Sequence, residues 1–229
     1  MAGNIGDLLL RPDAFFRRLV EEPESLKIPA LIVIAGGLIA AAAAYIISGT
    51  YAKMFEAAAG AGMATFIGLF GAISAFIGFV LIWWIIFAGV FTVISMVFKG
   101  SGSFKRTLQC TGYGLLPVVI GSVISLLVAL YYVPMIQAPV LTSFSDPAAI
   151  QGAMEGMLQD PAFREFTLIS TVISVIFLAW SANLWIFGMQ HARSLPLKQA
   201  AVTVLVPVVI YVVYVLFMAL NGIRLLGGS

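Results

Sequence analysis

Charged residues are scarce in this chain of 229 residues. Asp, Glu, Lys and Arg together make up 10% of the sequence, whereas hydrophobic residues make up 62% and the mean hydropathy is +1.08. Soluble domains usually have about a quarter of their residues charged. The composition therefore excludes an ordinary soluble domain and indicates an integral membrane protein. The small net charge of +2 gives no support for a nucleic-acid partner.

Cysteine and histidine, which are common ligands of zinc and common groups in nucleophilic catalysis, occur once each. Cys110 has no second thiol with which to form an intrachain disulfide, and its place in an apolar run predicts an inert core side chain. His191 cannot form a metal site alone, so we interpret it as a solvated or headgroup-contacting side chain rather than a pH sensor or ligand. Zincin, P-loop and nucleophile-elbow motifs are also missing. The sequence predicts no catalytic residue, metal or cofactor, and a protein that is not an enzyme.

Uncharged runs of the length needed to cross a bilayer, about 20 residues, recur along the chain. We predict an all-α integral membrane protein with a bundle of five transmembrane helices, at about residues 28–48, 72–98, 107–133, 166–189 and 201–220. Residues 57–71 are either a part of the second span or a separate outer helix. Small residues in the first span, among them Gly36 and Gly37, permit close approach of other helices, so we expect this span to lie centrally in the bundle.

Lys and Arg residues gather in three segments that fall on one side of the predicted spans. Residues 1–27, 99–106 and 190–200 contain nine of the twelve. Short basic loops resist translocation, which predicts a cytoplasmic N-terminus and an extracytoplasmic tail at residues 221–229. Residues 1–27 contain acids as well as bases and lack a short apolar core, so no signal peptide is expected.

Two short amphipathic helices are predicted outside the spans. After Pro12, the spacing of Phe15, Phe16, Leu19 and Val20 gives one apolar face. This helix either lies in the headgroup plane, which we favour, or docks on the cytoplasmic side of the bundle.

Two Asp-Pro pairs mark helix starts on the opposite side of the membrane. Asp146-Pro147 is predicted to begin the second amphipathic helix, and Asp160-Pro161 to begin the fourth span. Each pair combines a capping acid with Pro at the first helical position. Capping explains both acids, so we do not interpret them as a catalytic pair.

The third span contains polar residues, and small residues that let another helix approach closely. Gly112, Gly114 and Pro117 lie where it enters the membrane, so we expect a kink there. In the fourth span, Asn183 needs a partner in hydrocarbon, either another helix or a substrate or lipid. Tyr113 and Asn183 are expected at the same depth, about 10 Å below the surface at about 1.5 Å per residue, so we predict a hydrogen bond between them.

Several of these segments carry a family resemblance. The runs are Gly102-Ser-Phe-Lys-Arg-Thr-Leu, Tyr113-Gly-Leu-Leu-Pro117, Arg11-Pro-Asp-Ala-Phe-Phe-Arg-Arg-Leu, Trp180-Ser, Gly188-Met and His191-Ala-Arg-Ser-Leu-Pro-Leu-Lys-Gln-Ala200. Together they resemble the Yip-domain family of five-span membrane proteins, whose eukaryotic members are linked to Rab-type GTPases and early secretory traffic. The resemblance implies a non-enzymatic role and a GTPase-like cytosolic partner in eukaryotic relatives. The long polar N-terminal region of the eukaryotic trafficking members is missing, so we expect a prokaryotic plasma-membrane protein.

We therefore predict a membrane organiser or adaptor that presents a basic cytoplasmic face to membrane lipids or to a cytosolic protein. The candidate lipid- or partner-facing residues are Arg17, Arg18, Lys99, Lys105, Arg106, His191, Arg193 and Lys198. The candidate interhelical polar and packing residues are Gly102, Gln109, Tyr113, Pro117, Trp180 and Asn183. The alternative is a small transporter, channel or lipid-handling protein with a polar cavity between the third and fourth spans. The oligomeric state is open, with a homo-oligomer as one alternative.

Overall fold

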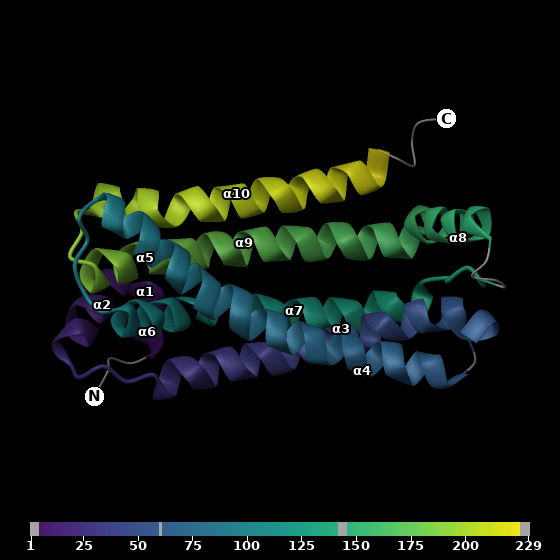
Figure 1. Ribbon diagram of the computed structural model, residues 1–229, viewed down its shortest axis with the longest axis horizontal. Helices are drawn as coiled ribbons and strands as arrows, with labels where there is room; N and C mark the ends of the chain where they lie inside the picture. Colours follow the sequence, from purple (N-terminus) through teal and green to yellow (C-terminus); the bar gives the residue numbers. More distant parts are fainter. Residues whose placement is uncertain (1–4, 60, 142–145, 225–229) are drawn as a thin grey trace. The chain divides into compact units, whose positions relative to one another are not determined.

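The computed structural model describes residues 5–59, 61–141 and 146–224, and all regular elements in these ranges are helices (Figure 1). In chain order they are α1 (Ile5–Leu10), α2 (Pro12–Glu21), α3 (Lys27–Ala59), α4 (Ala61–Gly78), the π-helix η1 (Phe79–Ile86), α5 (Phe87–Val97), α6 (Phe104–Gly114), α7 (Leu116–Tyr132), the 3₁₀ turn η2 (Val133–Met135), α8 (Pro147–Gln159), α9 (Pro161–Ala192) and α10 (Leu197–Arg224).

Five helical segments of the described chain are long and apolar enough to cross a membrane, which confirms the predicted number of spans. They are span 1 (Lys27–Met54), span 2 (Thr65–Val97), span 3 (Phe104–Met135), span 4 (Pro161–Ala192) and span 5 (Leu197–Ala219). Helix α4 runs without a break into η1 and α5, so residues 61–71 belong to the helix of span 2. The last five residues of the predicted tail, 225–229, lie outside the described residues.

Spans 3 and 4 are the most enclosed. The most apolar stretch of each span can be compared by the share of its residues that are buried. This share is 39% in span 3 and in span 4, but only 17% in span 1. The prediction that span 1 is central is therefore wrong. Its small residues do provide close contacts, since a Cβ at Gly36 would lie 2.5 Å from the Phe79 ring and 2.8 Å from Val119 Cγ2.

The kink predicted in span 3 is present as a break between α6 and α7. Pro117 has no N–H to donate to the carbonyl of Tyr113, four residues earlier. Leu115 lies in the break and donates its N–H to Gly112 O at 3.3 Å, one residue short of the α-helical partner. The carbonyl of Thr111 therefore lacks the N–H donor that Leu115 would supply in a regular α-helix.

The π-helix η1 in span 2 is a feature that the sequence pattern does not predict. It contains Trp83 and Trp84, and π geometry rotates the side chains that follow relative to an α-helix. The Trp83 ring contacts Phe87 and Tyr211, with ring centroids 5.2 and 4.9 Å apart.

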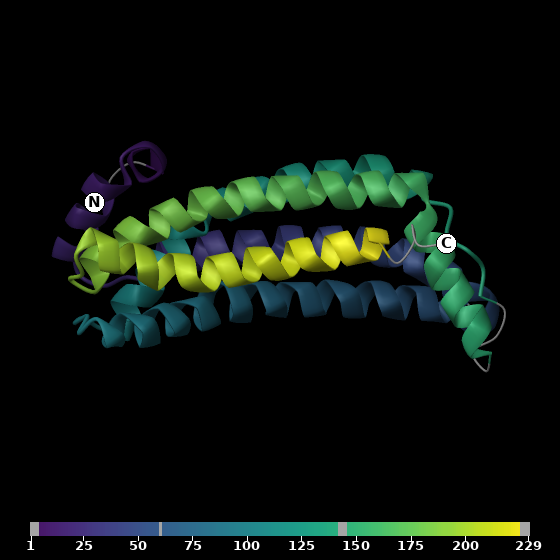
Figure 2. The same cartoon turned by 90° about the horizontal axis from the view of Figure 1, so that it is seen from above.

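The chain divides into two compact units. Unit 1 comprises Met1–Gly37, Gly78–Gly121 and Val175–Val212; unit 2 comprises Leu38–Ile77, Ser122–Ser174 and Val213–Ser229. All three basic segments of the sequence fall in unit 1. Within that unit, Figure 2 shows the N-terminal helices beside the end of α9 that leads into α10.

Unit 2 holds the second amphipathic helix, α8. Asp146 caps it by accepting a hydrogen bond from the Ala148 N–H at 3.0 Å, and Asp160 caps α9 in the same way from Phe163 at 2.9 Å. Both Asp-Pro helix starts are thus confirmed. A small buried cluster of Met54, Leu141 and Ala153 holds α8.

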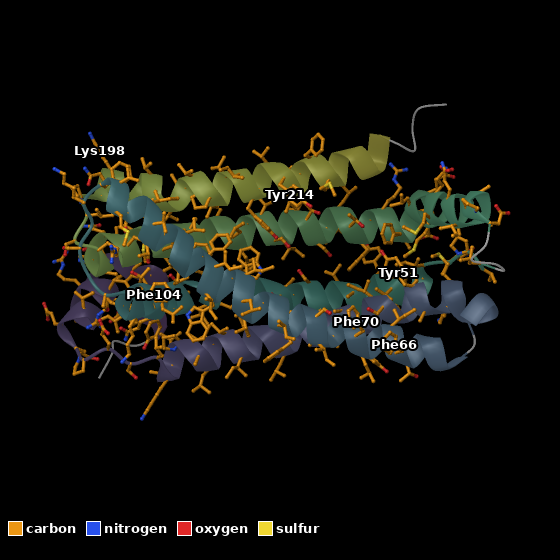
Figure 3. All side chains as sticks on the ribbon, in the orientation of Figure 1. Tyr51, Phe66, Phe70, Phe104, Lys198 and Tyr214 are labelled. Atoms are coloured by element: carbon orange, nitrogen blue, oxygen red, sulfur yellow. The ribbon has the colours of Figure 1, made fainter. Side chains whose placement is uncertain are left out.

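The lipid-facing character of unit 2 is clear on α4. Phe66 and Phe70 are exposed on one face of that helix, and their rings stack with centroids 6.1 Å apart (Figure 3). Large exposed apolar rings in a membrane-spanning helix are typical of a surface that contacts hydrocarbon.

Candidate functional site

The N-terminal amphipathic helix α2 is docked on the protein. Phe15, Phe16 and Leu19 are each at most 2% exposed. The Phe15 ring meets the ring of Tyr113 in α6 edge-on at 5.2 Å, and the Phe16 ring lies over Gly188 of α9, 3.5 Å from where a Cβ would be. Of the two arrangements that the sequence left open, docking on the bundle is therefore the one observed, and not the favoured position in the headgroup plane, because α6 and α9 already cover the apolar face.

Arg106 holds the C-terminal end of α2. Its guanidinium donates hydrogen bonds to the carbonyls of Leu19 at 2.9 Å, Val20 at 3.4 Å and Glu22 at 2.6 Å. It also donates to Gln109 Oε1 at 2.8 Å and lies 3.8 Å from Glu24. The last carbonyls of a helix lack N–H partners and carry partial negative charge, so a cation there is favourable. One side chain of α6 thus fixes a helix more than 80 residues earlier in the chain.

Arg193 performs a similar task between the α5–α6 turn and the α9–α10 link. It is 3% exposed and donates to Ser95 Oγ at 2.9 Å, to Gly100 O at 3.0 Å and to Gly102 O. Burial lowers the pKa of its guanidinium, which nevertheless stays protonated at neutral pH. Gly102 has φ +130°, and a Cβ there would lie 2.3 Å from Ala192 O, so the turn requires glycine at this position.

His191 links the end of α9 to α2. Its Nε2 lies 2.8 Å from Asp13 Oδ1, and its side chain is 15% exposed. The hydrogen bond from His191 lowers the pKa of the Asp13 carboxyl, an effect that partial burial opposes and Arg17 reinforces. This polar contact supplements the apolar docking of α2.

Two tryptophans, one from span 2 and one from span 4, pack against α6 at its two glycines. Trp84 donates its indole N–H to Leu108 O at 2.8 Å, and Trp185 donates to Thr111 O at 2.9 Å, the carbonyl released by the break before Pro117. A Cβ at Gly112 would lie 2.9 Å from Trp84 Nε1, and one at Gly114 would lie 2.2 Å from Trp185 Cδ1. The absence of a side chain at Gly112 and Gly114 leaves the space that the two indole rings occupy.

The outcome is one interlocked surface, which we name the basic end: residues 5–27, 99–106 and 190–200. The three basic segments of the sequence contain nine Lys and Arg but five Asp and Glu, a net charge of +4, whereas the rest of the chain contains three and five, a net charge of −2. Lys198 projects from the start of α10 in this region (Figure 3).

The arrangement can be compared with known proteins. Residues 6–220 match the Yip1 domain. The chain belongs to the Yip1 domain family. An uncharacterised protein of the archaeon Methanocaldococcus jannaschii is 42% identical over 128 residues, which cover 56% of this chain and 89% of that protein. No solved structure matches.

The eight predicted lipid- or partner-facing residues of this Yip1 domain separate into two groups. Arg17, Arg18, Lys99, Lys105 and Lys198 are exposed. Arg106, His191 and Arg193 are instead largely enclosed. Their interpretation as surface contacts is corrected, because each guanidinium or imidazole has partners inside the protein.

The interhelical candidates also divide. Gly102, Gln109, Tyr113 and Pro117 lie in unit 1, with Gln109 2% and Tyr113 5% exposed. Asn183 is exposed on α9 and forms no side-chain hydrogen bond with the described part of the chain, so its predicted interhelical hydrogen bond is wrong. Trp180 is 36% exposed on the same helix, and its ring centroid lies 6.1 Å from that of Phe177, so its predicted contact with another helix stays a prediction. Asn183 and Trp185 are two residues apart, so their side chains point in directions about 200° apart around a helix of 3.6 residues per turn. Because Trp185 faces α6, Asn183 faces away from Tyr113.

The contacts of Asp13, Ser95 and Trp84 with distant parts of the chain were missed from the sequence. Asp13 lies in the first turn of α2, where an acid is already expected for the helix dipole. Ser95 and Trp84 are inside apolar runs of span 2. For Trp185 a signal existed, since Gly112 and Gly114 predict a close neighbour.

We expect Arg106→Met to release the end of α2 and to cost about 2 kcal/mol, because a charged donor to several carbonyls is lost. Hydrogen–deuterium exchange in nanodiscs should show faster exchange in residues 12–21. Lys105→Met, the adjacent exposed cation, is the matched control and should leave this exchange unchanged. Equal exchange in the two variants would show that Arg106 does not hold α2.

The Asp13–His191 contact predicts an acid-dependent stability. The folded-state pKa of Asp13 is lowered, so its contribution is present above the unfolded pKa of about 3.9 and is lost as pH falls through the folded pKa. Thermal unfolding in detergent should therefore show a steeper loss of Tm below about pH 4 for the wild type than for Asp13→Asn. The partners facing Asp13 are His191 and Arg17. Parallel pH profiles would contradict this assignment.

Proposed function

We propose that this Yip1 domain is a non-enzymatic membrane organiser or adaptor, whose basic end faces the cytoplasm and binds membrane lipids or a cytosolic protein. The observation that carries the proposal is the interlocking of three distant segments by Arg106 and Arg193. These side chains direct their hydrogen bonds mainly to backbone carbonyls, which fixes a surface rather than forming a reaction centre. A fixed surface with exposed charge suits recognition.

The proposed orientation is supported by the charge distribution. The basic end has a net charge of +4 and the rest of the chain −2. Short basic segments favour the cytoplasmic side, which supports a cytoplasmic N-terminus and an outer C-terminus. The similarity to an archaeal protein supports a prokaryotic plasma membrane as the location. Reporters fused after Ser101 and after Gln151 test the orientation, and they should read cytoplasmic and outside, respectively.

The outer surface of α1 and α2 is the part best suited to a protein partner. Arg18 pairs with Asp7 at 2.6 Å and Arg17 pairs with Asp13, so both signs of charge lie side by side in water. Mixed charge in fixed positions favours specificity over general attraction to anions. A GTPase-like protein is the partner class that the family favours, and a second copy of this chain is another.

The alternative of a transporter, channel or lipid-handling protein depended on a polar cavity lined by Asn183. That side chain is exposed on α9, and Tyr113 is buried against Phe15 instead. Asn183, which was predicted to line that cavity beside the kinked third span, therefore gives the alternative no support.

Affinity purification in native lipid tests the adaptor function. The wild type is compared with Arg17→Gln/Arg18→Gln and with Lys53→Gln/Arg164→Gln, a control pair in unit 2. We expect a cytosolic protein to co-purify with the wild type and the control pair, and to be lost with the Arg17/Arg18 variant. The absence of any cytosolic protein, or the same protein in all three samples, would overturn the proposed binding of a cytosolic protein by the basic end.

A further inference from the structure

The nine Lys and Arg side chains of the basic end fall into three groups. Arg106 and Arg193 are enclosed by backbone acceptors. Arg17 and Arg18 are exposed, and each is paired with an aspartate. The remaining five are exposed and form no ion pair with the described part of the chain: Arg11, Lys27, Lys99, Lys105 and Lys198.

This last group differs from Arg17 and Arg18 in its neighbours along the chain. Each of the five has a large exposed apolar residue one or two positions away: Leu10, Ile28, Val97, Phe104 and Leu197, respectively. In contrast, the residues next to Arg17 and Arg18 are Phe16 and Leu19, which are buried under α2. A cation beside an exposed apolar side chain fits the boundary of a membrane, where the apolar part enters hydrocarbon and the charge stays in the headgroups.

Three of these five cations, each with its neighbouring apolar residue, lie at the end of a span and therefore at that boundary. Val97 is the last residue of span 2, while Phe104 and Leu197 are the first residues of spans 3 and 5. Lys99, Lys105 and Lys198 thus lie within two residues of a span end. In the first turn of a helix, side chains lean toward the N-terminus. Lys105 and Lys198 therefore extend their ammonium groups out of the hydrocarbon, toward the level of the lipid phosphates.

The turn that contains Lys99 is fixed before any ligand binds. Lys99 has φ +60°, in the left-handed region, and the carbonyls of Gly100 and Gly102 are both held by Arg193. A cation on a fixed turn loses less conformational entropy on binding than one on a free loop.

We propose that Lys99, Lys105 and Lys198 form a binding site for phosphate-bearing anionic lipid headgroups in the membrane that the protein spans. Phe104 and Leu197 anchor this site in the acyl boundary, whereas Arg17 and Arg18 take no part in it. The inference rests on the proposed function, because it assigns a ligand class to one part of the same basic end.

Lipid retention by the full-length protein tests the assignment. The protein is reconstituted in nanodiscs of equal phosphatidylcholine and phosphatidylglycerol, extracted in mild detergent, and the two retained lipids are quantified by mass spectrometry. The variant is Lys105→Gln/Lys198→Gln, and the comparison variant, matched in charge and region, is Arg17→Gln/Arg18→Gln. Far-UV circular dichroism and Tm establish that both variants are folded.

Each lysine near an anionic surface contributes about a five-fold preference for anionic lipid. The enrichment of phosphatidylglycerol should therefore fall about tenfold or more in the lysine variant and stay at the wild-type value in the arginine variant. Equal losses would show attraction by net charge alone, and no loss in either would exclude the lysines; both results overturn the site. Only lipid and protein are present, so the result is separate from the co-purification of a cytosolic partner.

Discussion

Replacing Arg193 by Met should lower the free energy of unfolding by about 3 kcal/mol and Tm by roughly 10 °C, the larger of the expected effects on the basic end. The side chain is 3% exposed and its donors satisfy Ser95 Oγ and the carbonyls of Gly100 and Gly102. A methionine fills much of the space but leaves these acceptors without donors, and the desolvation cost of each remains.

The conservative change is informative here. Arg193→Lys should recover only part of the loss, because an ammonium group lacks the planar fork that reaches both glycine carbonyls. Lys198→Met, which replaces an exposed cation in the first turn of α10, is the matched control and should change stability by about 0.5 kcal/mol at most. Thermal unfolding in detergent measures all three. A Tm for Arg193→Met equal to that of the control would refute the structural role of this residue.

Gly114→Ala is the second change with a large expected effect, about 3 kcal/mol of destabilisation. The added Cβ would lie 2.2 Å from Trp185 Cδ1 and 2.4 Å from its Nε1. Trp185 is fully buried among Phe87 and Phe91, with ring centroids 5.6 and 5.5 Å away, so the ring has no free space to enter. Its hydrogen bond to Thr111 O would be strained or broken as well.

A second glycine in the same unit provides the control. A Cβ at Gly89 in α5 would meet nothing within 4 Å beyond its own stretch of helix in the described part of the chain. Gly89→Ala should therefore be neutral or stabilise by about 0.5–1 kcal/mol through lower chain entropy in the unfolded state. Tryptophan fluorescence and Tm, measured on both variants, should separate them. If Gly114→Ala is tolerated as well as Gly89→Ala, the contact between Gly114 and the Trp185 ring does not constrain the packing.

The spans and caps were predictable because their causes are local. An uncharged run of sufficient length is enough to identify a membrane helix, and Asp146 and Asp160 each sit directly before a proline that begins a helix. Pro117 breaks span 3 through its own missing N–H. None of these inferences needs a residue from another part of the chain.

The roles of Arg106 and Arg193 were not predictable, because their acceptors are backbone carbonyls 84 to 93 residues away. A count of basic residues treats buried and exposed cations alike. For Asn183, the length of the helix gave its depth but not the direction in which the side chain points around the axis. Docking of α2 also depends on distant residues, since its pattern of Phe15, Phe16 and Leu19 suits lipid and protein equally.

The reactivity of Cys110 tests most directly whether α2 is docked as part of the basic end. This single cysteine is fully buried, and its Cβ lies 3.2 Å from the position of a Gly188 Cβ, beside the Phe16 ring. In membranes, a small maleimide should modify Cys110 at least about tenfold more slowly in the wild type than in Phe15→Asp/Phe16→Asp, in which α2 is released. Equal labelling rates in the two proteins would contradict the docked arrangement.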